Sequence, residues 1–115
     1  MDNDTLFDKI LSGDVPSEGV YEDEDVYAFR DINPQAPEHV LVIPRKKMAS
    51  FTDIKNADAA DVGRFMQSVS KVATKLGLDE GGYRVVFNSG PDAQQSVAYI
   101  HAHILGGRQM SWPPG

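Results

Sequence analysis

The chain has 115 residues, enough for one domain that buries about two-thirds of its unfolded surface. It contains no cysteine, which excludes thiol catalysis, disulfides and cysteine-ligated metal sites. Its net charge of −6, from 17 acidic and 11 basic residues, argues against nucleic acid as the main partner, and no apolar run is long enough to span a bilayer. We therefore expect a single cytoplasmic domain over residues 1–115 that binds neither nucleic acid nor membrane.

The first third of the chain predicts a short helix and a hairpin. Apolar residues at three- and four-residue steps indicate a helix over residues 5–11, with Asp4 or Thr5 as its N-cap. Two β-prone runs, at 19–22 and 26–30, are separated by three acidic residues, a pattern typical of two strands joined by a tight turn.

The rest of the chain predicts one long helix and three more strands. The nearly continuous apolar run 39–44 is typical of a buried strand, and the basic run 45–47 after it indicates a solvated edge. Helical spacing of apolar residues marks an amphipathic helix over 57–76, and residues 83–87 and 97–105 indicate the last two strands. These elements predict an α+β fold.

The chain has three histidines, and two of them lie two residues apart in the last predicted strand. On a strand, the side chains of Tyr99, His101 and His103 project from one face. The third, His39, begins another predicted strand. The three imidazoles could bind a metal ion, or one of them could act as a nucleophile while its second ring nitrogen is held by a carbonyl or carboxylate. The spacing alone leaves both hypotheses open.

Uncharged hydrogen-bonding residues precede this strand. Residues 88–90 (Asn-Ser-Gly) and 94–96 (Gln-Gln-Ser) offer amides, hydroxyls and backbone N–H groups that suit a nucleotide phosphate. The same residue types form ordinary turns far more often than phosphate sites. Their position just before the histidines favours the phosphate interpretation.

Four blocks of the chain resemble the histidine-triad nucleotide-binding proteins, the Hint branch of the histidine-triad (HIT) superfamily. The blocks lie at 5–10, 28–44, 83–88 and 95–115, and the last includes the run Leu-Gly-Gly-Arg-Gln-Met and the closing Trp-Pro-Pro-Gly. The resemblance covers nearly the whole chain. It implies a HIT-like fold, with a short N-terminal helix, one long helix and a five-stranded antiparallel sheet that is extended across a homodimer.

The resemblance also implies an activity. Proteins of this branch cleave adenosine or guanosine 5′-phosphoramidates and related nucleotidyl bonds to the nucleoside monophosphate, through a nucleotidyl-histidine intermediate and without a metal or other cofactor. We therefore expect a purine-nucleotide phosphoramidase, a hydrolase that acts on P–N bonds. The alternative is a nucleotide-binding dimer with a regulatory or scaffolding role and weak activity.

Positions that match the family's motifs carry its roles. By this resemblance His101 is the nucleophile, His103 contacts the phosphate, Ser96 assists at the phosphate and leaving group, and His39 is the outer histidine of the site. Asp31 would accept the ribose hydroxyls. The remaining nucleotide contacts implied in this way are Leu6, Phe7, Ile10, Val15, Phe29, Ile32, Asn88, Gln94 and Gln95.

The chain departs from the family at the first residue of the triad, where Tyr99 replaces a histidine. In the family the backbone carbonyl at this position accepts the Nδ1–H of the nucleophile, and a carbonyl survives any change of side chain. We therefore expect an altered rate or substrate preference more than a loss of activity. Gln94 also stands where many relatives have glycine, and Ser89 where an acidic residue is common.

Overall fold

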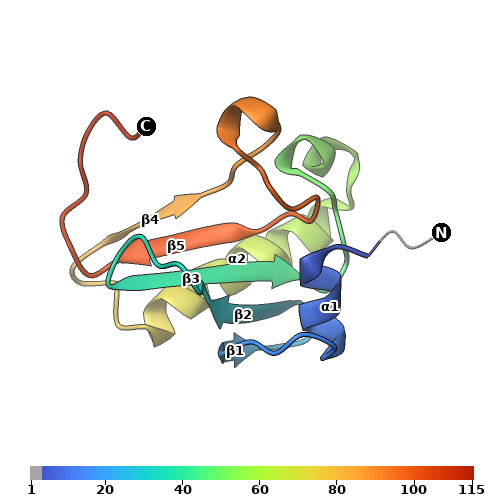
Figure 1. Cartoon of the computed structure of the whole chain (residues 1–115), viewed down its shortest axis with the longest axis horizontal. Coiled ribbons are helices and arrows are strands. Elements are labelled where there is room, and N and C mark those ends of the chain that lie inside the picture. Colours follow the sequence, from blue (N-terminus) through green and yellow to red (C-terminus); the bar gives the residue numbers. More distant parts are fainter. Residues whose placement is uncertain (1–3) are drawn as a thin grey trace.

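Five antiparallel strands form one sheet, with an α-helix packed on each of its faces (Figure 1). The computed structural model describes residues 4–115. The strands are β1 (Gly19–Glu22), β2 (Val26–Arg30), β3 (Glu38–Pro44), β4 (Tyr83–Val86) and β5 (Ala102–Gly106), in the order β1-β2-β3-β5-β4. The helices are α1 (Leu6–Ser12) and α2 (Ala59–Lys75), with two short 3₁₀ helices, η1 (Phe51–Asn56) and η2 (Pro91–Ala93). The α+β class and the five-stranded antiparallel sheet are confirmed.

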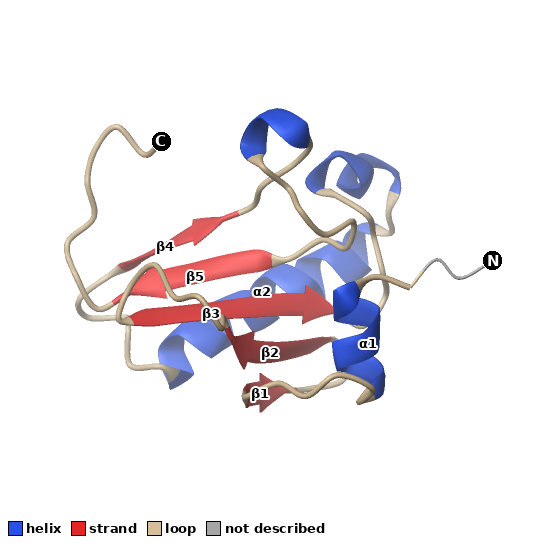
Figure 2. Ribbon diagram, viewed as in Figure 1, coloured by secondary structure: helices blue, strands red, loops and turns tan. Residues whose placement is uncertain are grey.

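The two faces of the sheet bury different sets of side chains. Side chains on a strand alternate between faces, so each central strand contributes to both. One face packs against α2 through a purely hydrophobic cluster of Val26, Ala28, Val40, Val42, Ile100, Ala102 and Ile104 with Phe65, Val69, Val72, Ala73 and Leu78. The other face carries α1 (Figure 2). A smaller cluster of Phe7, Phe29, Leu41, Ile43 and Tyr99 lies there.

Both helices begin and end close to the positions that the sequence predicts. Thr5 is the N-cap of α1, and Gly13 ends it in the left-handed region at φ 89°, where glycine has no Cβ to clash. Asp58 caps α2 by accepting a hydrogen bond from the backbone N–H of Asp61, so this helix starts two residues after the predicted boundary. Within residues 4–115, no helix is long and apolar enough to cross a bilayer.

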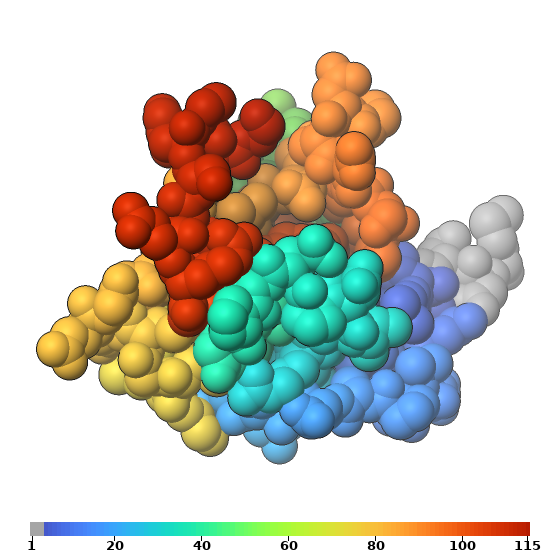
Figure 3. Space-filling view, turned by 60° about the vertical axis from the view of Figure 1, so that its left-hand side comes forward, coloured from blue at the N-terminus to red at the C-terminus, as the bar shows by residue number. Residues whose placement is uncertain are grey.

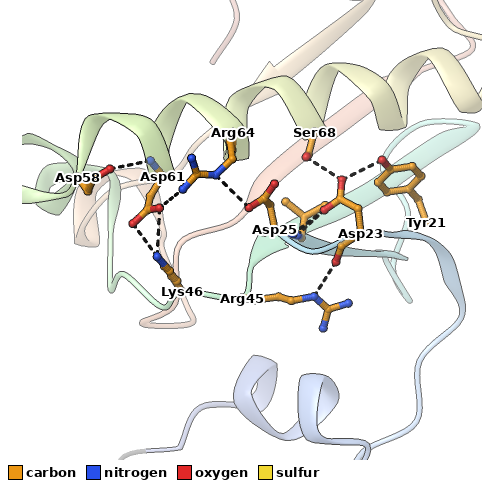
Figure 4. Close-up of polar contacts among 10 residues, drawn as sticks. Tyr21, Asp23, Asp25, Arg45, Lys46, Asp58, Asp61, Arg64 and Ser68 are labelled. Carbon is orange, nitrogen blue, oxygen red and sulfur yellow. Dashed lines mark hydrogen bonds and ion pairs between the residues drawn. The ribbon is translucent and has the colours of Figure 1, made fainter.

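The hairpin turn between β1 and β2 is fixed to α2 by one carboxylate (Figure 4). Asp23 accepts the backbone N–H groups of Asp25 and Val26 at 2.7 and 2.9 Å, which closes the turn. Its other oxygen accepts the hydroxyls of Tyr21 and Ser68 at 2.9 and 2.8 Å. Burial opposes ionisation most strongly, but these bonds together outweigh it and hold the pKa of Asp23 below its usual range, so the carboxylate stays charged.

The basic run after β3 is divided among three ion pairs. Arg45 pairs with Glu22, Lys46 with Asp61 and Lys47 with Asp8, at 3.0, 3.0 and 2.7 Å. Figure 4 shows Lys46 beside Asp61 on α2. Because each cation is paired with a carboxylate, the basic run links the end of β3 to β1, α2 and α1. This is in keeping with the interpretation of residues 45–47 as a solvated edge.

The last strand is shorter than the sequence predicts. The expected strand over 97–105 begins only at Ala102; residues 97–99 form a bend, and residues 100–101 belong to no helix or strand. The register that pairs Val42 with Ala102 would place Ile100 opposite Pro44, which has no N–H to donate. The N–H of Ile100 instead bonds to the carbonyl of Met48 at 2.7 Å. The histidine pair therefore straddles the start of β5.

Candidate active site

The three histidines lie together on the face of the sheet that carries α1. His39 is near the start of β3 and His103 is in the neighbouring strand β5, where it pairs with Leu41, two residues along β3. The ring centroids of His39 and His103 are 5.2 Å apart, and those of His101 and His103 are 4.9 Å apart. The sequence prediction that His101 and His103 share one side is therefore confirmed, although His101 precedes the strand.

His101 is held in one tautomer by the backbone. Its Nδ1 lies 2.7 Å from the carbonyl oxygen of Tyr99, and a carbonyl can only accept, so Nδ1 carries the proton and Nε2 keeps its lone pair. The ring is 6% exposed and lies 4.8 Å, centroid to centroid, from Phe7 of α1, in an edge-to-face arrangement. This neutral imidazole has the form that a nucleophile needs.

His39 and His103 are held in the opposite tautomer by a chain of hydrogen bonds. The backbone N–H of Gln35 donates to Nδ1 of His39 at 3.0 Å, so the proton of neutral His39 is on Nε2. That Nε2–H donates to Nδ1 of His103 at 2.9 Å, which places the proton of His103 on its own Nε2. Nε2 of His103 is buried and has no hydrogen-bond partner within residues 4–115. His103 can therefore donate one further hydrogen bond.

Burial keeps all three rings neutral near pH 7. Desolvation lowers the pKa of each imidazole, and that of His103 falls furthest, to about 4. For His103, repulsion from a proton on His101 or His39 lowers the pKa further. For His39 the nearby charge of Asp31 opposes the shift, and for His101 the bond to Tyr99 does so. A lone pair on His101 and an N–H on His103 are therefore available together at neutral pH.

Asp31 brings a carboxylate to this cluster. One oxygen lies 3.5 Å from Nε2 of His39, and the other accepts the backbone N–H of Asn33 at 2.8 Å. Ligand atoms of Asp31, His39 and His103 all lie within 4.8 Å of one another, a set that could hold a metal ion. The sequence hypothesis of a metal site had named His101 with the other two histidines, whereas the structure places Asp31 in that group.

In the loop before β5, a polar side chain expected to contact the nucleotide forms hydrogen bonds within the protein. Gln95 accepts the N–H of Gly90 and donates to the carbonyls of Ala49 and Val97, so its side-chain amide orders the loop. Gln94 is in the left-handed region, at φ 60°, a conformation that glycine adopts more readily than a residue with a Cβ. The side chain of Asn88 is half-buried and that of Ser96 is exposed.

The residues expected to hold the base differ in exposure. Phe7 and Phe29 are 5% and 4% exposed and pack against each other edge to face, with Ile10 beside them. Val15 is half-buried, but Leu6 is 48% and Ile32 is 99% exposed. The two exposed side chains are free to contact a ligand, whereas the two phenylalanines support the site from beneath.

Two contacts at this site were not found from the sequence. The first is the Gln35 amide, whose residue also accepts a hydrogen bond from Arg108 through its carbonyl at 3.1 Å. Figure 3 shows the chain after β5 (red) lying against the loop between β2 and β3 (cyan). The second is the hydroxyl of Tyr99, which bonds to the carbonyl of Pro44. A backbone amide leaves no signal in a sequence, and the tyrosine was noticed only as a missing histidine.

Comparison with known proteins finds relatives of this chain. The HIT domain family model matches residues 12–110. A maize protein named "14 kDa zinc-binding protein" is 52% identical over 99% of this chain and 90% of its own length. A protein of Arabidopsis thaliana named "Adenylylsulfatase HINT1" is 47% identical over 99% of this chain and 78% of its own length. The crystal structure of a HIT family hydrolase from Legionella pneumophila superposes with a TM-score of 0.91, at 46% identity, over 97% of this chain and all of that one.

Proposed function

This chain belongs to the HIT family, in its Hint branch, and on that premise we propose that it hydrolyses a purine nucleoside 5′-phosphoramidate or a related nucleotidyl bond. The observation that carries the proposal is the pair of opposite tautomers at the histidines. A ring with a free Nε2 lone pair stands beside a ring with a free Nε2–H. That combination suits attack on a phosphorus atom whose oxygen or leaving group receives a hydrogen bond.

The reaction would proceed in two displacements. In the first, Nε2 of His101 attacks the α-phosphorus as the P–N bond breaks; the nitrogen, protonated in the substrate, leaves as ammonia or the free amine, and the nucleotidyl group becomes bonded to His101. The carbonyl of Tyr99 stabilises the positive charge that develops on the ring, through the Nδ1–H bond. His103 donates from Nε2 to the phosphoryl oxygen or to the departing nitrogen, with the hydroxyl of Ser96 nearby in the chain. In the second displacement water attacks the phosphorus, the bond to Nε2 of His101 breaks, and one water proton passes to the solvent as the nucleoside monophosphate leaves.

The surroundings supply the binding contacts. Asp31 would accept the ribose hydroxyls with the carboxylate that now faces His39. Leu6 and Ile32 offer exposed apolar surface for the purine, supported by Phe7 and Phe29. Asn88, Gln94 and Ser96 stand in the loop before β5, where a phosphate would receive uncharged donors. No cofactor takes part in this scheme.

Mass spectrometry of protein quenched during turnover tests the proposal directly. Adenosine 5′-phosphoramidate and adenylyl sulfate are assayed in parallel, the second because of the name of the Arabidopsis relative. We expect AMP release and an adenylyl adduct on His101 with at least one of them. Absence of both turnover and adduct, for adenosine and guanosine substrates alike, would reject the enzymatic function and favour a binding role. An adduct on another residue would reject the assignment of the nucleophile.

We also propose that the active form is a homodimer joined along β4. This strand pairs with β5 on one side and with no other strand in the described part of the chain. Its side chains Tyr83 and Val85 are 36% and 39% exposed, an apolar edge of the kind that soluble proteins normally cover. Sedimentation should give a dimer, and Val85→Lys should shift it toward the monomer. A monomeric wild-type protein at micromolar concentration would reject this arrangement.

A metal-binding role is the second candidate function. It is favoured by the closeness of Asp31, His39 and His103 and by the name of the maize relative. The three donors suit zinc, but a metal ion would replace the hydrogen bond between His39 and His103. Metal analysis of protein purified without chelator tests this candidate. One zinc per chain, lost in Asp31→Asn, would support it, and metal-free protein with full activity would exclude it.

A further inference from the structure

Tyr99, the residue that replaces the first histidine of the triad, is buried on the face of the sheet that carries α1 and the histidines. Its side chain is 1% exposed and belongs to the cluster of Phe7, Phe29, Leu41 and Ile43. Burial raises the pKa of the phenol to about 12, so its hydroxyl keeps its proton. A buried hydroxyl needs a hydrogen-bond partner, and the identity of that partner decides what this residue can do.

The partner is the carbonyl oxygen of Pro44, the last residue of β3. The ladder between β3 and β5 stops at the pair Val42 and Ala102, and two residues further along β3 stands Pro44, which has no N–H to donate. The phenol therefore makes a bond to the end of β3 beyond the last rung of the ladder. Together with the bond from Ile100 to Met48, it fixes the stretch of chain that precedes β5.

The backbone of the same residue holds the nucleophile. The carbonyl of Tyr99 accepts the Nδ1–H of His101 at 2.7 Å. The ring of Phe7 lies 6.3 Å from the ring of Tyr99 and 4.8 Å from that of His101, so one α1 side chain packs against both. Lys47 stands 5.6 Å from the centre of the Tyr99 ring and forms an ion pair with Asp8 of α1. Tyr99 thus lies where α1, the end of β3 and His101 meet.

We propose that Tyr99 is a positioning residue, whose phenol hydroxyl anchors the backbone at the end of β3 and so sets the direction of the carbonyl that orients His101. The role rests on the proposed function of His101 as the nucleophile. The phenol never touches the substrate. It acts through its own carbonyl, so that the first triad position keeps its purpose with a different side chain.

Tyr99→Phe removes the hydroxyl and little else, and Tyr27→Phe is its matched control. Tyr27 also donates or accepts a single side-chain hydrogen bond, with Ser17 at 2.7 Å, and packs on Phe29 of the same cluster. We expect kcat to fall about 5- to 20-fold in Tyr99→Phe with KM changed less than about twofold, the pattern of a misaligned nucleophile. We expect Tyr27→Phe to keep both constants. Equal kinetics in the two variants would overturn the proposal.

Nitrogen-15 NMR of the imidazoles gives a readout that needs no turnover. In the wild type, His101 should show a single Nδ1–H tautomer, and the phenol proton of Tyr99 should exchange slowly. In Tyr99→Phe the population of the Nε2–H tautomer of His101 should rise, while in Tyr27→Phe it should not. A rapidly exchanging Tyr99 hydroxyl in the wild type, or an unchanged tautomer in folded Tyr99→Phe, would contradict the positioning role even if activity were lost.

The two measurements also separate this inference from the proposed function. If the wild-type protein turns over no nucleotide, the function fails, but the tautomer of His101 still reports whether Tyr99 orients it. Tyr99→His adds a further comparison because a histidine ring can also donate a hydrogen bond. Activity above that of Tyr99→Phe would support the need for a donor at this position. Activity of Tyr99→His below that of Tyr99→Phe would argue against a donor requirement.

Discussion

The two faces of the sheet are built from the same three central strands but serve different ends. The α2 face is built around a hydrophobic cluster in which Val26, Val40 and Val42 are fully buried, and the buried polar side chain of Ser68 on α2 is bonded to Asp23. The opposite face carries aromatic rings and the three histidines, with a buried Nε2 that lacks a partner within residues 4–115. Because successive side chains of a strand point to opposite faces, the residues that form the main hydrophobic core and the residues of the candidate active site lie on different sides of the same strands. A substitution should affect mainly the property of its own face, and four experiments examine this separation.

The largest expected effect is on the histidine face. His101→Asn removes the nucleophile, so turnover should fall at least about 10⁴-fold, equivalent to about 5 kcal/mol in the activation free energy. The free energy of unfolding should change far less than the activation free energy. The assay is AMP release by purified, folded protein, and a His101→Asn variant with more than about a tenth of wild-type activity would contradict both the mechanism and the division between the faces.

The next effect belongs to the α2 face. Phe65 is 1% exposed in the hydrophobic cluster, so Phe65→Ala should lower the free energy of unfolding by about 3 to 5 kcal/mol. Its neighbour Met66 is 41% exposed, and Met66→Ala serves as a control that should change stability by less than about 1 kcal/mol. Urea titration measures both. Activity per folded molecule should be kept in Phe65→Ala, and a selective loss of kcat would show that the faces are coupled.

The third effect is a dependence of stability on pH that arises from the histidine face. The folded-state pKa of each histidine is lowered, that of His103 to about 4, so the unfolded chain binds more protons below pH 6.5. The contribution of the neutral histidines to the free energy of unfolding is fully present above about pH 6.5 and should be lost as the pH drops toward about 4. His103 should account for about 2 to 3 kcal/mol of that loss.

Unfolding measured between pH 7 and 4.5 isolates this contribution. The carboxylates with lowered pKa values, Asp8, Asp23 and Asp61, titrate below their usual 3.8 and so act at lower pH. His103→Asn should flatten the slope in this window, while a substitution on the α2 face such as Val69→Ala should shift the curve without changing its slope. An unchanged slope in His103→Asn would contradict the lowered pKa of His103, because the ring would then bind its proton equally in the folded and unfolded chains.

The smallest effect lies in the loop before β5. Gln94 has φ 60°, a conformation that costs a residue with a Cβ about 1 kcal/mol, so Gln94→Gly should raise stability by about 0.5 to 1 kcal/mol. Gln94→Ala, which keeps the Cβ, is the matched control and should not stabilise. If turnover also changes in Gln94→Gly, the side chain contributes to the phosphate site as well as to the turn.

Much of the fold could be predicted because its signals are local. Thr5 and Gly13 bound the first helix, and the acidic residues 23–25 mark the hairpin turn that the carboxylate of Asp23 closes. The predicted start of the last strand was wrong by five residues. The sequence of 97–101 is as β-prone as that of a strand, and its pairing is prevented by Pro44, more than 50 residues earlier in the chain.

The sequence suggested which residues form the candidate site but not how those residues are connected. The spacing of His101 and His103 indicated a common side, and the resemblance to the Hint proteins suggested roles for them, for His39 and for Asp31. Neither could reveal that the Gln35 amide sets the tautomer of two histidines, or that the Gln95 side chain is engaged by the loop itself. Those facts depend on which donor meets which acceptor, which is settled by distances between segments far apart in the chain.

The sequence by itself determined the elements, the family and the set of chemically active side chains, because periodicity, caps and motifs are properties of neighbouring residues. The tertiary structure alone decided the protonation pattern and the new role of Tyr99. Those depend on the antiparallel register of β3 and β5, which brings the end of one strand to the phenol and the start of the same strand to His103. A hydrogen bond is specified by two partners in space, and only folding brings these partners together.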